Sequence, residues 1–77
     1  MVENAYVLIT TEIDRQEEVL QALQDNGSVK EAYAVSGVYN IIAILEAESM
    51  VELKNTVSTD IRDLPGVKST LTMVVTS

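Results

Sequence analysis

Residues 5–11 and 41–47 are two short segments whose alternating faces are both largely apolar. They consist mainly of Val, Ile, Leu and Ala, and their shortness predicts strands rather than helices. A strand with one face in water normally alternates apolar and polar side chains, which these segments do not. We therefore expect both strands to lie at the centre of a sheet.

Two further strands are predicted over residues 29–36 and 67–76. In the first, Val29, Tyr33 and Val35 are expected to share one face, because side chains alternate along a strand. In the second, apolar residues alternate with a set that is mostly Lys and Thr, which also favours a strand.

A first helix is predicted between residues 5–11 and 29–36. Asp14 and Glu17 form a pattern like a capping box at its start. Asn26-Gly27 is expected to end it, because both residues tolerate a left-handed backbone.

A second helix follows residues 41–47. Ser49 begins it with a clearer capping box, which Glu52 completes, and Pro65-Gly66 ends it. Its apolar stripe recurs every three or four residues, at Leu53, Val57, Ile61 and Leu64.

The resulting order, β-α-β-β-α-β, is that of a ferredoxin-like α+β fold. We expect an antiparallel four-stranded sheet with both helices on one face, since crossover connections are right-handed. The length predicts a single domain over residues 1–77.

The sheet face that the helices leave bare is expected to be apolar, because both faces of the central strands are. A large bare apolar patch usually marks an interface, although a sheet that exposes a few scattered aliphatic side chains is the alternative. The length supports the interface. A chain of 77 residues without cysteine or histidine has neither disulfides nor a Cys/His metal site to compensate for a small core.

The charge excludes two classes of partner. Twelve acidic and five scattered basic residues give a net charge of −7, so we expect no direct contact with nucleic acid or with an anionic membrane surface. No segment is long and apolar enough to span a membrane. The N-terminus carries Glu3 where a signal peptide would be positive, so we expect a cytoplasmic location.

The residue types needed for common catalytic sites are absent. Without histidine or cysteine the usual nucleophile–base pairs and tetrahedral zinc sites cannot form, and the three glycines are too far apart for a phosphate loop. Asp60 and Asp63 could share a helix face, but a solvated surface explains them better. We therefore predict no enzyme activity, no catalytic residue, no metal and no cofactor.

The turn after Gly37 is the candidate binding element. Tyr39 and Asn40 offer polar groups there, and a glycine-containing turn lets backbone N–H groups approach a ligand. Gly and Asn are also ordinary turn residues. Thr70 and Thr72 share one face of the last strand, where threonine is common for its β-propensity alone.

The run Val-Ser-Gly-Val-Tyr-Asn at residues 35–40 precedes an apolar strand, and Leu-Pro-Gly-Val at residues 64–67 precedes Ser-Thr-Leu-Thr at residues 69–72. This combination resembles the effector-binding domain of the leucine-responsive/asparagine regulator (Lrp/AsnC) family. That module is known as the RAM domain, for regulation of amino-acid metabolism. The resemblance covers nearly the whole chain. It implies a stand-alone module without a helix-turn-helix, because no such segment precedes the first strand.

The resemblance also implies partners and a site. RAM domains pair through their sheets into homodimers, which commonly form octameric rings, and they can assemble with a full-length regulator. Amino-acid effectors bind between the dimers. The family usually has Asp where this chain has Asn40, which removes a charged acceptor for the α-ammonium of a ligand. The implied ligand-binding residues are Gly37, Val38, Tyr39 and Asn40, with Thr70 and Thr72 nearby.

The sequence leaves two other functions open. One is a purely structural or interaction module in which the turn binds nothing. The other is a small enzyme of the dimeric α+β barrel class, which has the same element order. A regulatory domain of the ACT type would differ from the RAM domain only in its motifs.

Overall fold

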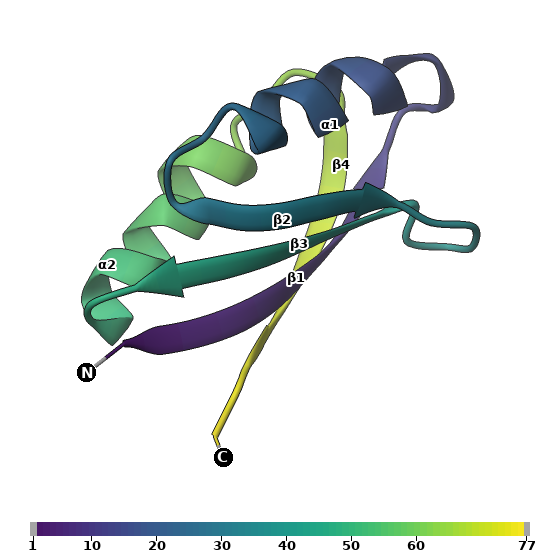
Figure 1. Ribbon diagram of the computed structural model, residues 1–77. Coiled ribbons are helices and arrows are strands. Elements are labelled where there is room, and N and C mark those ends of the chain that lie inside the picture. The colour runs from purple at the N-terminus through teal and green to yellow at the C-terminus, as the bar shows by residue number, and fades with distance from the viewer. Residues whose placement is uncertain (1, 77) are drawn as a thin grey trace.

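A four-stranded antiparallel sheet with strand order β2-β3-β1-β4 runs through the computed structural model, which describes residues 2–76 (Figure 1). The predicted ferredoxin-like fold is confirmed, and the two strands with apolar faces are the central ones. The strands are β1 (Glu3–Thr11), β2 (Val29–Ala34), β3 (Ile41–Ala47) and β4 (Val67–Val74).

Both helices cover the same face of the sheet (Figure 1). A 3₁₀ turn (Ile13–Arg15) leads into α1 (Gln16–Gln24), and α2 (Met50–Asn55) continues as a π-helical segment, η2 (Thr56–Ile61). The predicted apolar stripe of the second helix is confirmed. Leu53, Val57 and Ile61 are buried, and the partly buried Leu64 packs against the core. The fully buried large side chains are Val7, Ile9, Val19, Leu23, Ile41, Leu45, Leu53 and Ile61.

The second helix begins as predicted and the first does not. The Ser49 hydroxyl oxygen accepts a hydrogen bond from the backbone N–H of Glu52 at 3.1 Å. Asp14 instead lies inside the 3₁₀ turn, and no side chain caps α1. A tertiary contact sets this entry, because the backbone N–H of Glu12 donates to the Gly66 carbonyl oxygen at 2.8 Å.

The end of α1 also differs from the prediction. Neither Asn26 nor Gly27 has a positive φ. The Asn26 side chain closes the turn instead, because its Oδ1 accepts a hydrogen bond from the Ser28 backbone N–H at 2.8 Å. An asparagine side chain can thus mimic a backbone turn and make the left-handed residue unnecessary.

A bulge at Lys30 divides β2 into two phases. Val29 pairs with Leu45, whereas Glu31 pairs with the next residue of β3, Ile44. The extra residue turns Val29 toward the helices, where it is buried, while Tyr33 points to the other side. The prediction that these two residues share a face was therefore wrong.

The sheet face that the helices leave bare, called the open face below, is apolar as predicted. In the described residues, Tyr6 lies between Ile44 and Met73 of the neighbouring strands, and Leu8 lies between Ile42 and Leu71. Several of these side chains are exposed, with 39% of Tyr6, 44% of Leu71 and 47% of Met73 accessible. The apolar residues of the open face are Tyr6, Leu8, Tyr33, Ile42, Ile44, Leu71 and Met73.

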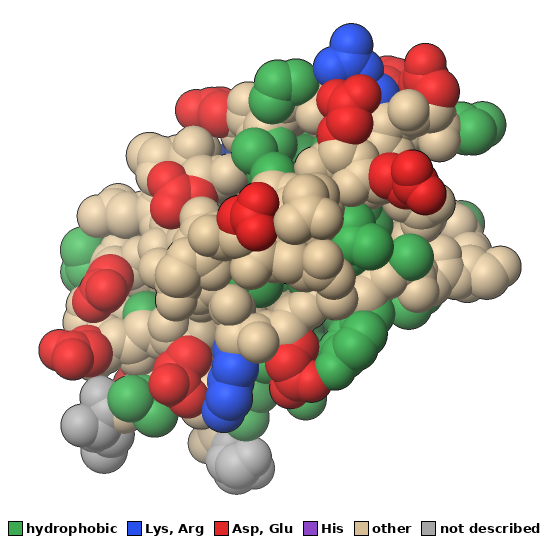
Figure 2. Space-filling model, turned by 45° about the horizontal axis from the view of Figure 1, so that its top comes forward, with side chains coloured by type: hydrophobic (Ala, Val, Ile, Leu, Met, Phe, Trp, Pro, Cys, Tyr) green, Lys and Arg blue, Asp and Glu red, His purple; other side chains and the backbone are tan. Residues whose placement is uncertain are grey.

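The surface reflects the acidic composition. Figure 2 shows acidic side chains spread over the face in view, with few basic ones among them. Among residues 2–76, two of the five basic residues form ion pairs, Arg15 with Glu18 at 3.6 Å and Lys30 with Glu46 at 3.5 Å. No helix among residues 2–76 is long and apolar enough to cross a membrane.

Candidate functional site

The loop that contains Gly37 connects β2 to β3 and is held by backbone and side-chain hydrogen bonds. The backbone N–H of Val35 donates to the Asn40 carbonyl oxygen at 3.0 Å, and the Thr10 hydroxyl donates to the Val38 carbonyl oxygen at 3.0 Å. Gly37 has a φ of +148°, which favours glycine. The Val38 side chain is exposed and Tyr39 is half-buried, so this loop presents an apolar and an aromatic side chain to solvent.

The side chain of Asn40 is bound to Thr11 of the central strand β1 through both ends of its amide. The Asn40 Oδ1 accepts from the Thr11 backbone N–H at 3.0 Å, and the Asn40 Nδ2 donates to the Thr11 Oγ1 at 2.9 Å. The Thr11 hydroxyl donates in turn to the Glu12 carbonyl oxygen at 3.0 Å. Because Thr11 is buried, these bonds hold the loop firmly against β1.

The backbone of Asn40 also connects three elements. Its N–H donates to the Ile9 carbonyl oxygen at 2.9 Å, and its carbonyl oxygen accepts from the Gln16 Nε2 at 2.7 Å. Its amide side chain retains one proton and one lone pair beyond its bonds to Thr11. Asn40 is thus first a structural residue, with limited capacity to bind a ligand.

Thr70 and Thr72 lie on the helix-covered face of the edge strand β4. Thr70 pairs with Ile9 and Thr72 with Val7, and both of these partners are buried in the core. Thr72 lines a cavity below α2, and Thr70 lines a second cavity of about 270 Å³ near Arg62.

The structure does not bring all six predicted residues into one pocket of a single chain. The loop at residues 37–40 joins β2 and β3, whereas the threonines lie on β4, and the central strand β1 separates them. Neither cavity that a threonine lines includes a residue of that loop. Neither of these two cavities therefore brings the loop and the threonines to one ligand.

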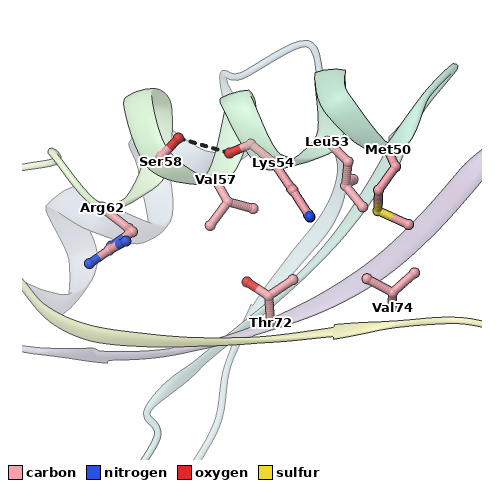
Figure 3. A pocket seen from close by; sticks show the side chains of 8 residues that line it. All are labelled: Met50, Leu53, Lys54, Val57, Ser58, Arg62, Thr72 and Val74. Carbon is pink, nitrogen blue, oxygen red and sulfur yellow. Dashed lines mark hydrogen bonds between the residues drawn. The ribbon is translucent and has the colours of Figure 1, made fainter.

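The cavity between α2 and β4 was missed from the sequence. It measures about 410 Å³, and Figure 3 shows Lys54 extending from α2 toward Thr72 on the strand below. The signal was present, because Lys54 and Arg62 lie two helical turns apart on the helix that carries the apolar stripe. The lining residues are Met50, Leu53, Lys54, Val57, Ser58, Arg62, Thr72 and Val74.

Among residues 2–76, the buried polar side chains are those of Thr11 and Thr56, and no acidic or basic side chain is buried. No cluster of His, Cys, Asp or Glu in this range could hold a metal ion. One tyrosine is perturbed: the Tyr33 hydroxyl donates a hydrogen bond to the Glu31 carboxylate, and this bond, with the carboxylate charge, raises the pKa of Tyr33. Both residues are exposed and lie on the edge strand β2.

The model of the Lrp/AsnC ligand binding domain family matches residues 4–77. No curated protein matches the sequence.

Several solved structures are similar. FFRP-DM1 is 31% identical, with 96% of this chain and 99% of that chain aligned and a TM-score of 0.93. The hypothetical protein PHS023 from Pyrococcus horikoshii is 32% identical, with 100% and 92% aligned and a TM-score of 0.90. The transcriptional regulator NMB0573 from Neisseria meningitidis, solved as an L-Met complex, is 14% identical, with 97% of this chain and 50% of that chain aligned and a TM-score of 0.88. At that identity the likeness shows a shared fold.

Proposed function

The chain belongs to the family of Lrp/AsnC ligand binding domains, and on this premise we propose that it is an amino-acid-binding, self-associating module that modulates transcription. It acts in the cytoplasm by changing the assembly of a regulator, either as a homo-oligomer or together with a full-length Lrp/AsnC protein. It does not contact DNA itself, because a chain with a net charge of −7 is repelled by phosphates. This role is regulatory rather than enzymatic.

The open face is the observation that carries the proposal. Its side chains form continuous cross-strand rows, such as Ile44, Tyr6 and Met73. Covering them with the same face of a second copy removes apolar surface from water, at about 25 cal/mol for each Å² buried. Such a dimer is the unit from which larger rings would be built.

The amino acid binds where two dimers meet. One copy supplies Gly37, Val38, Tyr39 and Asn40, and another supplies Thr70 and Thr72. The separation of these two groups in a single chain supports a shared site. The L-Met complex of NMB0573 supports an amino acid as the ligand.

Size-exclusion chromatography with light scattering, followed by thermal unfolding with each amino acid, tests the proposal. The expected species is a dimer or larger, and at a hundredfold excess over Kd one amino acid should stabilise it by about 2.7 kcal/mol. Tyr39→Ala should abolish this stabilisation, whereas Val51→Ala, at an exposed position of α2, should retain it. A monomer at micromolar concentration would refute the association. A shift that survives Tyr39→Ala would place the ligand elsewhere.

A second candidate function is a structural module whose β2–β3 loop binds nothing, and the bonds between Asn40 and Thr11 favour it. An aspartate at position 40 could not donate to Thr11 Oγ1, so the Thr11 hydroxyl would have to turn from Glu12 toward the carboxylate. In a structural module whose β2–β3 loop binds no ligand, Asn40→Asp would change only the stability of the fold. If the loop binds an amino acid, Asn40→Asp should strengthen that binding through the added charge.

A further inference from the structure

We propose that the cavity between α2 and β4 is a second ligand site, which binds an aliphatic monocarboxylate that lacks an α-ammonium group, such as a branched 2-oxo acid. It shares Thr72 with the amino-acid site proposed above but includes no residue of the β2–β3 loop. The inference does not depend on that proposed function.

One part of the cavity is apolar. Met50 and Leu53 descend from α2, and Val74 rises from β4 below them (Figure 3). Leu53 is fully buried, which gives that part a rigid wall, whereas Met50 is only partly buried and its unbranched side chain can adapt to a ligand. A volume of about 410 Å³ lies within the range of roughly 300–1,000 Å³ that small-molecule sites occupy.

The other part of the cavity is cationic. Lys54 and Arg62 line it, and neither has a carboxylate within 4.0 Å among residues 2–76, whereas Arg15 and Lys30 are both paired. Lys68 lies beside Arg62 in the neighbouring cavity. Three of the five basic residues of an acidic chain thus gather on one side of β4, which favours an anion there.

The available donors select the ligand class. The Ser58 hydroxyl already donates to the Lys54 carbonyl oxygen at 2.8 Å, so the side chains that remain for a ligand are Lys54, Arg62 and Thr72. A carboxylate suits the two cations, and a 2-oxo group suits the hydroxyl of Thr72. No Asp or Glu lines the cavity, so the ammonium group of an amino acid would face two positive charges without a counter-ion. The site therefore discriminates a deaminated acid from its amino acid.

Titration of the full chain with four six-carbon probes, followed by calorimetry and ¹⁵N NMR, tests this site. The probes are 4-methyl-2-oxopentanoate, 4-methylpentanoate, leucine and 4-methylpentan-1-ol. The two carboxylates should bind and shift the amide signals of residues 50–62 and 72–74 while leaving those of residues 37–40 in place. Leucine and the alcohol should leave the signals of residues 50–62 unchanged, and residue 72, which both proposed sites share, is not used to compare leucine with the 2-oxo acid. Shifts of residues 50–62 with leucine as large as those with the 2-oxo acid, or no shifts of these residues with either carboxylate, would overturn the proposal.

Three variants connect the binding to the charges. Lys54→Met and Arg62→Gln should each weaken binding of the 2-oxo acid roughly 10-fold or more, because hydrogen bonds to charged groups are worth about 1.5–3 kcal/mol. Both positions are exposed, so these variants should fold, and their thermal unfolding verifies this. Lys30→Met removes a cation outside the cavity and should leave the affinity unchanged. Unchanged affinity in both cavity variants would contradict the site. The signals of residues 50–62 report on this cavity and those of residues 37–40 on the amino-acid site, so failure of one site is distinguishable from failure of the other.

Discussion

Gly66 shows how a single residue can be constrained by two independent effects. Its backbone φ of +97° is one that residues other than glycine rarely adopt, and a Cβ built there would lie 2.7 Å from the Cβ of Arg15. Its carbonyl oxygen also accepts the hydrogen bond from Glu12 that sets the entry to α1. Gly66, which follows the second helical segment and precedes β4, therefore also positions the first helix.

Gly66→Ala should lower the free energy of unfolding by about 2 kcal/mol or more, because strain at a positive φ alone costs about 1–3 kcal/mol and the clash with Arg15 adds to it. Gly27→Ala is the matched control. No atom lies within 4 Å of the Cβ built at that position, and its φ is not positive, so alanine there should be neutral or stabilise by about 0.4–1 kcal/mol. Urea denaturation measures both, and equal values would contradict this account.

The pair Tyr33 and Glu31 gives a pH-dependent signal at the residue scale. Because the carboxylate raises the pKa of Tyr33, the folded protein holds this proton more tightly than the unfolded chain. The contribution of Tyr33 to stability is then complete below its ordinary pKa of 10.0 and is lost as the pH rises through the folded value.

Ultraviolet titration measures this shift as the difference between the wild-type protein and Tyr33→Phe. The midpoint should lie above 10.0 and should move downward in Glu31→Gln, which removes the charge. A midpoint that does not change in Glu31→Gln would show that the carboxylate is not the cause.

At the scale of the elements, α2 begins through a side chain that the sequence identifies. Ser49→Ala removes the hydrogen bond from the Glu52 backbone N–H and should cost about 1 kcal/mol of stability. Ser58→Ala is the control, since Ser58 bonds back to the Lys54 carbonyl oxygen inside the helical segment, where a serine contributes little. Thermal or urea unfolding should show a lower stability for Ser49→Ala than for Ser58→Ala. If Ser49→Ala left the free energy of unfolding unchanged, the cap would be dispensable.

The sequence predicted the elements well where local chemistry determines them. Strand β3 has the predicted bounds, and the second helix begins at its predicted cap, because apolar alternation and capping are local signals. The prediction from the sequence was wrong at Asp14, because the bond between Glu12 and Gly66 sets the entry to the first helix. It was also wrong at Val29, because the bulge in β2 turns this side chain to the opposite face of the sheet.

The candidate site was predictable only in part, for the same reason. The loop at residues 37–40 was recognisable as a turn, but the bonds between Asn40 and Thr11 join residues 29 positions apart. The cavity needs Lys54 of α2 and Thr72 of β4 to meet across the fold. No local sequence pattern predicts contacts between residues that are so far apart in the chain.

At the scale of the whole molecule, the proposed association through the open face can be tested by one charge. Leu71→Lys places a charge beside Leu8 on this face and should convert the proposed dimer to a monomer at micromolar concentration. Val51→Lys is the matched control, because Val51 is 70% exposed on α2 and lies outside the open face. Light scattering after size exclusion measures both. If Leu71→Lys remains a dimer, the association uses another surface.

The bulge in β2 has a consequence for aggregation. The two edges of the sheet are β2, which is short and distorted at Lys30, and β4, whose pairing with β1 is regular from Ser69 to Val74. A bulged edge with a lysine resists the addition of another strand, whereas a regular edge accepts one. Copies that join edge to edge are therefore expected to meet through β4, which gives closed pairs, because the bulged edge β2 disfavours the further addition by which a fibre would grow.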